Sequence, residues 1–147
     1  MNYVFDINII LSYLSDDNVR RKVDSLYNPL DKKHTVILSI VTVREIKSMA
    51  QRNSWGYRRI NAVERLIKKF LIIDVSSEPM LNIYADIETF SQGKHETKKL
   101  NTSARNMGKN DLWIAATTFI TKSKLITMDK DFTHLDKVYF DLILMER

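Results

Sequence analysis

The chain has no cysteine, and it has three glycines and two prolines among its 147 residues. The lack of cysteine excludes disulfide bonds and thiolate metal sites, and it fits the cytoplasm, where we expect this protein. So few glycines and prolines exclude collagen-like and low-complexity chains. No apolar run reaches the ~18 residues of a membrane helix. The first residues also do not show a positively charged segment followed by an apolar one, as a signal peptide would.

What the sequence does contain is apolar and mildly basic. Hydrophobic residues make up 44% of it, enough to bury a core, and the length suits one domain over residues 1–147. Lys and Arg number 23 against 18 Asp and Glu, a net charge of +5. Such an excess permits nucleic acid as a partner but does not by itself indicate one.

Short apolar runs alternate with amphipathic segments along the chain. Runs rich in β-branched residues predict strands over residues 3–5, 35–40, 71–76 and 124–129, with a candidate edge strand over 138–144. The apolar spacing predicts helices over residues 7–14, 16–27, 41–53, 56–70, 78–93 and 110–123, and a loop over 94–109. This alternation predicts an α/β fold, a single-domain α/β/α sandwich with a central, mainly parallel sheet of four or five strands.

Four carboxylates occupy equivalent places in this pattern. Asp6 follows the first predicted strand, and Asp129 follows the run "LITM" at the end of the fourth. Glu45 lies about one turn into the helix after the second strand, and Asp111 begins the helix before the fourth strand. Functional groups of parallel sheets gather beyond the C-terminal strand ends. If the strands before Asp6 and Asp129 are neighbours, all four acids can converge in one crevice.

Carboxylates held that close repel one another, and their pKa values rise. Their grouping makes physical sense if a divalent cation lies among them, and oxygen ligands without Cys or clustered His favour Mg²⁺ or Mn²⁺. Such an ion beside a basic surface is typical of phosphodiester cleavage, because it activates water and screens the charge on the phosphate. Asp6 is the strongest single indication, since an unpaired charge in an apolar run is costly to bury.

Three of the four acids also have an ordinary structural explanation, and Asp6 is the hardest to explain in that way. Residues 42–45 fit a capping box, in which Glu45 reaches back to the start of its helix. The negative charge of Asp111, in the first turn of a helix, would interact favourably with the helix dipole. Asp129 with Asp131 fits a turn. The combination of acids therefore carries the metal hypothesis, and no single one does.

The chain resembles PIN domains at four motifs, which occur in the family's order. They are "YVFDINIIL", "TVILSIVTVREI", "GKNDLWIAATT" and "KLITMDKDF", with Asp6, Glu45, Asp111 and Asp129 as their acids. The length and the lack of a further domain are most similar to VapC-type toxins of bacterial toxin–antitoxin pairs. One departure is Ile7, which stands where family members often have Thr or Ser directly after the first acid.

The resemblance implies a metal-dependent endoribonuclease, the toxin of a type II toxin–antitoxin pair, which cleaves structured RNA such as tRNA or rRNA by metal-activated water. It implies Mg²⁺ or Mn²⁺ as the cofactor, with the four acids as catalytic residues and metal ligands. It further implies a homodimer, a co-encoded antitoxin that blocks the site, and no membrane.

Other residues are second-tier candidates around these acids. Asn8 and Thr127 could each hydrogen-bond a ligand carboxylate and fix its rotamer, and Asp131 could assist Asp129. Basic residues before the third motif could contact RNA phosphates: Lys94, Lys98, Lys99, Arg105 and Lys109.

Three other functions stay open at this stage. A non-catalytic PIN-like module could bind RNA or protein. A phosphatase of the haloacid dehalogenase class has a similar α/β fold, but it needs a second Asp where this chain has Asn8. A DNA nuclease is also open, because no feature of the sequence distinguishes RNA from DNA.

Overall fold

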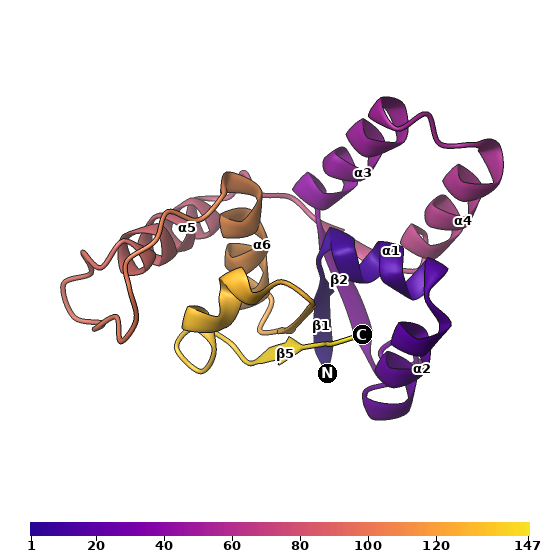
Figure 1. Cartoon of the computed structure of the whole chain (residues 1–147). Helices are drawn as coiled ribbons and strands as arrows, with labels where there is room; N and C mark the ends of the chain where they lie inside the picture. Colours follow the sequence, from indigo (N-terminus) through magenta and orange to yellow (C-terminus); the bar gives the residue numbers. More distant parts are fainter.

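A five-stranded sheet forms the centre of the computed structural model, which describes residues 1–147 (Figure 1). Its strands are β1 (Asn2–Phe5), β2 (Thr35–Ser39), β3 (Leu71–Ile73), β4 (Lys124–Thr127) and β5 (Leu142–Leu144). They lie in the order β3-β2-β1-β4-β5, and every neighbouring pair is parallel. The predicted α/β class is confirmed, and the candidate fifth strand lies at the edge of the sheet.

Six α-helices and one 3₁₀ helix connect the strands. They are α1 (Ile7–Ser15), α2 (Asp17–Leu26), α3 (Ile40–Arg52), α4 (Tyr57–Ile67), α5 (Glu78–Ser91), α6 (Lys109–Ile120) and the 3₁₀ helix η1 (Lys130–Leu135). The six predicted helices are confirmed, with their ends displaced by a few residues. The 3₁₀ helix was not predicted, because its segment is too short to show helical spacing. No helix of the protein is both long and apolar enough to span a bilayer.

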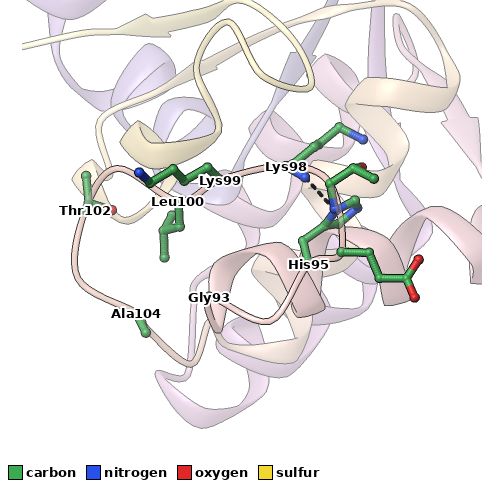
Figure 2. Close-up of a pocket in the computed structure, with 9 residues that line it drawn as sticks. Gly93, His95, Lys98, Lys99, Leu100, Thr102 and Ala104 are labelled. Carbon is green, nitrogen blue, oxygen red and sulfur yellow. Dashed lines mark hydrogen bonds between the residues drawn. The ribbon is translucent and has the colours of Figure 1, made fainter.

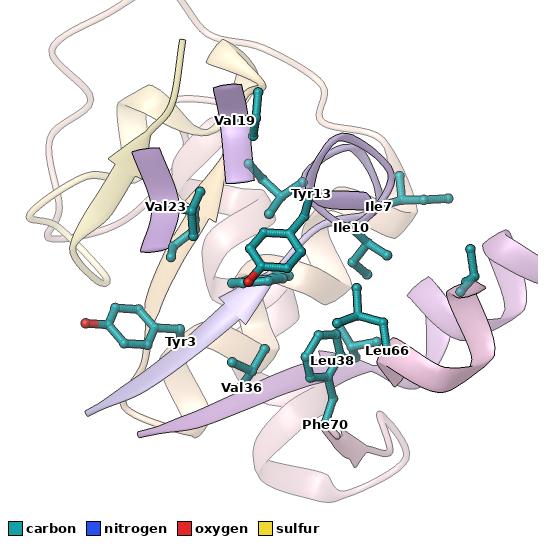
Figure 3. Packing of buried hydrophobic residues seen from close by; sticks show 14 of the residues in the cluster. Tyr3, Ile7, Ile10, Tyr13, Val19, Val23, Val36, Leu38, Leu66 and Phe70 are labelled. Carbon is teal, nitrogen blue, oxygen red and sulfur yellow. The ribbon is translucent and has the colours of Figure 1, made fainter. Parts of the chain in front are cut away.

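The central strands are buried on both faces, which explains their continuous apolar sequences. Tyr3 and Phe5 of β1 point into one core with apolar residues of α1, α2 and α4 (Figure 3). Val4 points into the opposite core, which includes Leu112 of α6 and Phe132 of η1. Side chains alternate between the two faces of a strand, so the three layers follow directly from the sequence.

Helix α3 begins before Thr42, which would have to be its N-cap if residues 42–45 formed a capping box. Its first residue is Ile40, and the N-cap is Ser39, whose Oγ accepts a hydrogen bond from the Val41 N–H at 3.3 Å. Thr42 lies inside the helix, and its buried hydroxyl has no hydrogen-bond partner. The capping box of residues 42–45 was therefore wrong, because strand β2 passes directly into the helix at Ser39. Glu45 is left without a capping role.

Residues 92–108 form no helix or strand, as expected, but hydrogen bonds order this loop. His95 Nδ1 accepts hydrogen bonds from the backbone N–H groups of Thr97 and Lys98 at 3.1 and 3.0 Å (Figure 2). The ring's proton is therefore on Nε2, which donates to Asp86 Oδ1 on α5 at 2.9 Å. Tyr139 Oη donates to the other oxygen of Asp86 at 2.6 Å. These bonds attach the loop to α5.

Candidate functional site

Strands β1 and β4 are neighbours, which is the condition on which the convergence of the acids depended. Their register pairs Phe5 with Ile126, so Asp6 and Thr127 come next at the same edge of the sheet. Helix α6 precedes β4 and runs back across the sheet, so its first turn lies at this edge with Asp111. The C-terminal edge of the sheet therefore gathers residues from β1, β4, α6 and η1.

Asp6 is a buried carboxylate, with only 4% of the residue exposed. It is the N-cap of α1, since its Oδ1 accepts a hydrogen bond from the Ile9 N–H at 3.0 Å. The Thr127 hydroxyl donates a hydrogen bond to its Oδ2. Burial raises the pKa of Asp6 to about 6, although both hydrogen bonds lower it, and the charges of Asp129 and Glu45 raise it further. The charged form of Asp6 is thus destabilised in the folded protein.

Asp111, Asp129 and Asp131 form the tightest group of acids in the protein, hereafter the acidic trio. Each offers a carboxylate oxygen, and the three oxygens lie within 4.8 Å of one another. Burial raises the pKa of Asp111 to about 6, and the charge of Asp129 is the next cause, followed by that of Asp6. Asp129 also caps η1, since its Oδ1 accepts from the Asp131 N–H at 2.8 Å.

The trio contains two of the four acids expected as metal ligands, Asp111 and Asp129, and one that was not among the four. Asp131, a second-tier candidate in the sequence analysis, belongs to it, while Asp6 and Glu45 do not. Glu45 lies close enough for its charge to raise the pKa of both Asp6 and Asp111. Asp6 and Glu45 therefore flank the trio, and all five acids share one electrostatic field.

The two second-tier polar candidates differ in where they lie. Thr127 is fully buried, donates to Asp6, and accepts a hydrogen bond from the Asp129 N–H at 2.9 Å. It therefore links the two acids that follow β1 and β4. Asn8 is exposed, and its side chain makes no hydrogen bond to any carboxylate. The first turn of α1 directs Asn8 to solvent, so it does not support Asp6 as expected.

No Lys, Arg or His side chain forms an ion pair with these five acids. The ion pairs of the structure lie elsewhere: Arg20 with Asp17, Lys137 with Asp141, and His95 and Lys98 with Asp86. The neighbouring Arg44 donates instead to Asn110 Oδ1 at 3.1 Å, which ties α3 to the start of α6. Several carboxylate groups without an ion-pair partner, two of which (Asp6 and Asp111) have raised pKa values, are a ligand set that fits a hard divalent ion. The residues present therefore fit the Mg²⁺ or Mn²⁺ expected from the sequence.

The basic residues expected to contact RNA do not form one continuous group. Lys98 and Lys99 border a hollow of the 92–108 loop that contains none of the five acids (Figure 2). Lys98 is also engaged, with its Nζ 3.7 Å from Asp86 Oδ2 and 5.1 Å from the centre of the Tyr139 ring. Arg105 is nearest to the trio, since its guanidinium donates to the backbone oxygen of Asp131 at 3.4 Å.

The last two basic candidates lie on either side of Arg105 along the chain. Lys94 borders a shallow hollow together with Arg105, and Lys109 is the first residue of α6. Arg105 also shares a hollow with Asp131 and Gly108. These three residues, Lys94, Arg105 and Lys109, are called the basic path: Arg105 contacts the trio, Lys94 shares a hollow with Arg105, and Lys109 is two residues before Asp111.

Sequence reasoning missed a buried polar group behind the trio. Ser91 at the end of α5 lies 2.7 Å from His134 of η1, measured from Oγ to Nε2. These residues are 43 positions apart and belong to no motif. No pattern in the sequence pointed to the pair, since each residue alone is an ordinary polar residue at the end of an element.

Comparison with known proteins identifies the fold. No curated protein matches the sequence. The structure is similar to VapBC2 from Rickettsia felis bound to a promoter DNA fragment, with a TM-score of 0.78, 18% identity, and coverage of 99% of this chain and 100% of that one. VapBC-1 from nontypeable Haemophilus influenzae gives a TM-score of 0.72 at 22% identity, covering 98% of each chain. FitAcB from Neisseria gonorrhoeae gives 0.71 at 24% identity, covering 96% of each.

At these identities the likeness to solved structures shows the fold alone. The family follows from a separate comparison of the sequence with family models. The model described as PIN domain matches residues 3–138, a range that includes all five acids at the C-terminal edge of the sheet. The chain therefore belongs to the PIN domain family.

Proposed function

We propose that this protein is a Mg²⁺- or Mn²⁺-dependent endoribonuclease, and that it is the toxin of a type II toxin–antitoxin pair. The observation that carries the proposal is the convergence of five acids from β1, α3, α6, β4 and η1 with no protein cation among them. Two of these acids have pKa values raised to about 6. Membership of the PIN family supports the same conclusion.

The acids divide into roles by their surroundings. We assign Asp111 and Asp129 to the metal, together with Asp131, because their oxygens already lie within 4.8 Å of one another. Asp6 completes the ligand set from its buried position, where Thr127 and the Ile9 N–H fix its rotamer. A divalent ion held there would supply Lewis-acid chemistry, lowering the pKa of water and screening charge on a phosphodiester.

Glu45 has a different role in this proposal. It is half-buried on the second turn of α3 and lies outside the trio, and no hydrogen bond or ion pair occupies its carboxylate. We assign to it the orientation of the water that attacks the phosphodiester. A carboxylate suits that role because it accepts a hydrogen bond from the water and can receive its proton.

The substrate and partners of the proposal are RNA and an antitoxin. The path of Lys94, Arg105 and Lys109 beside the acids supports contact with phosphates. The similar structures from R. felis and H. influenzae are described as VapBC assemblies. We extend to this chain a cognate antitoxin, a homodimer and a cytoplasmic place of action on structured RNA such as tRNA or rRNA.

The direct test is cleavage of structured RNA by the purified chain. We expect cleavage with Mg²⁺ or Mn²⁺, none with EDTA, and a fall to background in Asp6→Asn and Asp129→Asn. Asp74→Asn is the matched control, because Asp74 follows β3 at the same edge of the sheet but is exposed and outside the acidic group. Full activity in Asp6→Asn would refute the proposed site.

Two parallel substrates separate this function from its alternatives. Hydrolysis of an aryl phosphate without RNA cleavage would indicate a phosphatase, and cleavage of DNA alone would indicate a DNA nuclease. Binding of RNA without turnover at any metal concentration would indicate a non-catalytic module. Sequencing of RNA ends after brief induction in bacteria, against an Asp6→Asn control, would then identify the target.

A further inference from the structure

A buried chain of polar side chains lies behind the acidic trio. Ser91, the last residue of α5, is 1% exposed, and His134 of η1 is 7% exposed. His134 Nε2 and Ser91 Oγ are 2.7 Å apart, and Ser91 Oγ donates to Met107 Sδ at 3.3 Å. The imidazole also stacks on Phe90, with the ring planes 4° apart. Three segments that are distant in sequence therefore meet at Ser91.

The direction of these hydrogen bonds depends on the tautomer of His134. Burial lowers the pKa of His134 to about 4, so the ring is neutral near neutral pH and has one N–H. The serine hydroxyl also has one hydrogen. With the hydroxyl donating to Met107, the ring donates from Nε2 to Ser91; in the other tautomer Nδ1–H faces the Asp131 backbone oxygen and Nε2 accepts from Ser91. In both tautomers Nε2 and Ser91 Oγ stay hydrogen-bonded.

Each end of this chain lies a few residues from an acid of the trio. His134 is three residues after Asp131 on η1, and Met107 is four residues before Asp111 at the approach to α6. The Ser91 backbone oxygen accepts a further bond from the Arg105 N–H at 2.9 Å. No hydrogen bond joins η1 to α6 directly. Two polar links join η1 to the segment before α6: the chain through buried Ser91, and the exposed bond from the Arg105 guanidinium to the Asp131 backbone oxygen at 3.4 Å.

We propose that Ser91 and His134 are positioning residues that set the separation of Asp111 and Asp131, and thereby the affinity of the acidic trio for a divalent cation. This inference rests on the proposed metal-dependent function. Neither residue touches the cation or the RNA. They act by holding η1 and the start of α6 at a fixed distance. Metal sites lose about tenfold to 100-fold in affinity when residues that orient their ligands are replaced.

The experiment measures Mn²⁺ binding to the full chain by calorimetry, well below the melting temperature of every variant. Ser91→Ala and His134→Leu should each weaken Mn²⁺ binding by about tenfold. His134→Gln should restore binding close to wild type, because its side-chain amide can donate from near the position of Nε2. The double variant should bind no more weakly than the weaker single variant, since both remove one linkage.

Ser123→Ala is the control for loss of a buried serine hydroxyl. Ser123 is 5% exposed and bonds to Thr121 Oγ1 at 2.6 Å, but it precedes β4 at the edge of the sheet opposite the acids. It should lower the melting temperature as Ser91→Ala does and leave the Mn²⁺ dissociation constant unchanged. Equal Mn²⁺ affinity in wild type, Ser91→Ala and His134→Leu would overturn the inference while leaving the proposed function intact. A wild-type chain that binds no Mn²⁺ would overturn both.

Discussion

Replacing Asp6 with Asn should stabilise the metal-free protein at neutral pH while abolishing its activity. The carboxylate is almost fully buried, and no Lys, Arg or His pairs with it. Burial raises its pKa from 3.8 to about 6. Asn retains the oxygen that caps α1 and removes the charge, and Asn is among the preferred N-cap residues.

The magnitude follows from the shift in pKa. A rise of roughly 2 units, at 1.36 kcal/mol for each unit, penalises the charged form by about 3 kcal/mol. The folded chain holds the proton more tightly than the unfolded chain does. The contribution of Asp6 to stability is therefore complete below pH 3.8 and is lost as the pH rises through about 6. The Asn variant undergoes no such loss.

The assay is urea unfolding in EDTA, followed by circular dichroism, at about pH 4 and about pH 7.5. The measured quantity is the free energy of unfolding of the variant minus that of the wild type. We expect this difference to be larger by about 2.4 kcal/mol at the higher pH, because about 0.6 kcal/mol of the penalty is already present at the lower pH. Subtracting the value at the lower pH cancels any change in packing or hydrogen bonding at position 6. Asp74→Asn is the control, because Asp74 is exposed.

A difference between Asp6→Asn and wild type that is the same at both pH values would refute this reasoning. It would mean that Asp6 ionises as easily in the folded chain as in the unfolded one. The site would then contain a compensating positive group or enough water to solvate the charge. In either case the pKa of Asp6 would no longer support the argument for a metal site.

Four further predictions concern the metal, the RNA and one ion pair. Mn²⁺ should raise the melting temperature more at pH 7.5 than at pH 5, because protons compete for Asp6 and Asp111, whose pKa values are raised to about 6. Thr127→Val removes the hydrogen bond to Asp6, so Mn²⁺ affinity should fall by about tenfold. The pH at which Mn²⁺ binding is half-maximal should move upward, and an unchanged value would exclude a role of Thr127 in stabilising the charged form of Asp6. Lys94→Ala should reduce the slope of log RNA affinity against log salt by up to about 1 without changing the melting temperature, because Lys94 is exposed and forms no ion pair. Lys98→Ala should instead lower the melting temperature, because Lys98 pairs with a carboxylate of α5; equal melting temperatures would contradict the pairing.

The fold was predictable because its signals are local. The strands are short β-branched runs buried on both faces, so their composition identifies them without knowledge of their neighbours. The positions of Asp6 and Asp129 followed from one rule about the ends of parallel strands. The structure added that β1 and β4 are neighbours, a fact about topology that no local pattern contains.

The details of the site were less predictable because they depend on distant contacts. Asp131 joins the trio only because residues 130–135 form a 3₁₀ helix capped by Asp129. Asn8 was expected to hydrogen-bond a ligand carboxylate, but the first turn of α1 directs its side chain to solvent. Thr127 was correctly placed beside a carboxylate, and its bond to Asp6 spans 121 residues. Such outcomes depend on where a helix begins, which sequence patterns define poorly.

The raised pKa values and the proposed affinity for a cation have one physical cause. Five acids from separate elements create a strong negative potential in a half-buried place, and a proton and a divalent ion compete for it. If Asp6 served only to cap α1, Asn would do so without the penalty of a buried charge. The chain instead retains a charge that destabilises it near neutral pH, and an ion that binds the folded state relieves that destabilisation. The instability of the metal-free site is thus itself an argument that the site binds metal.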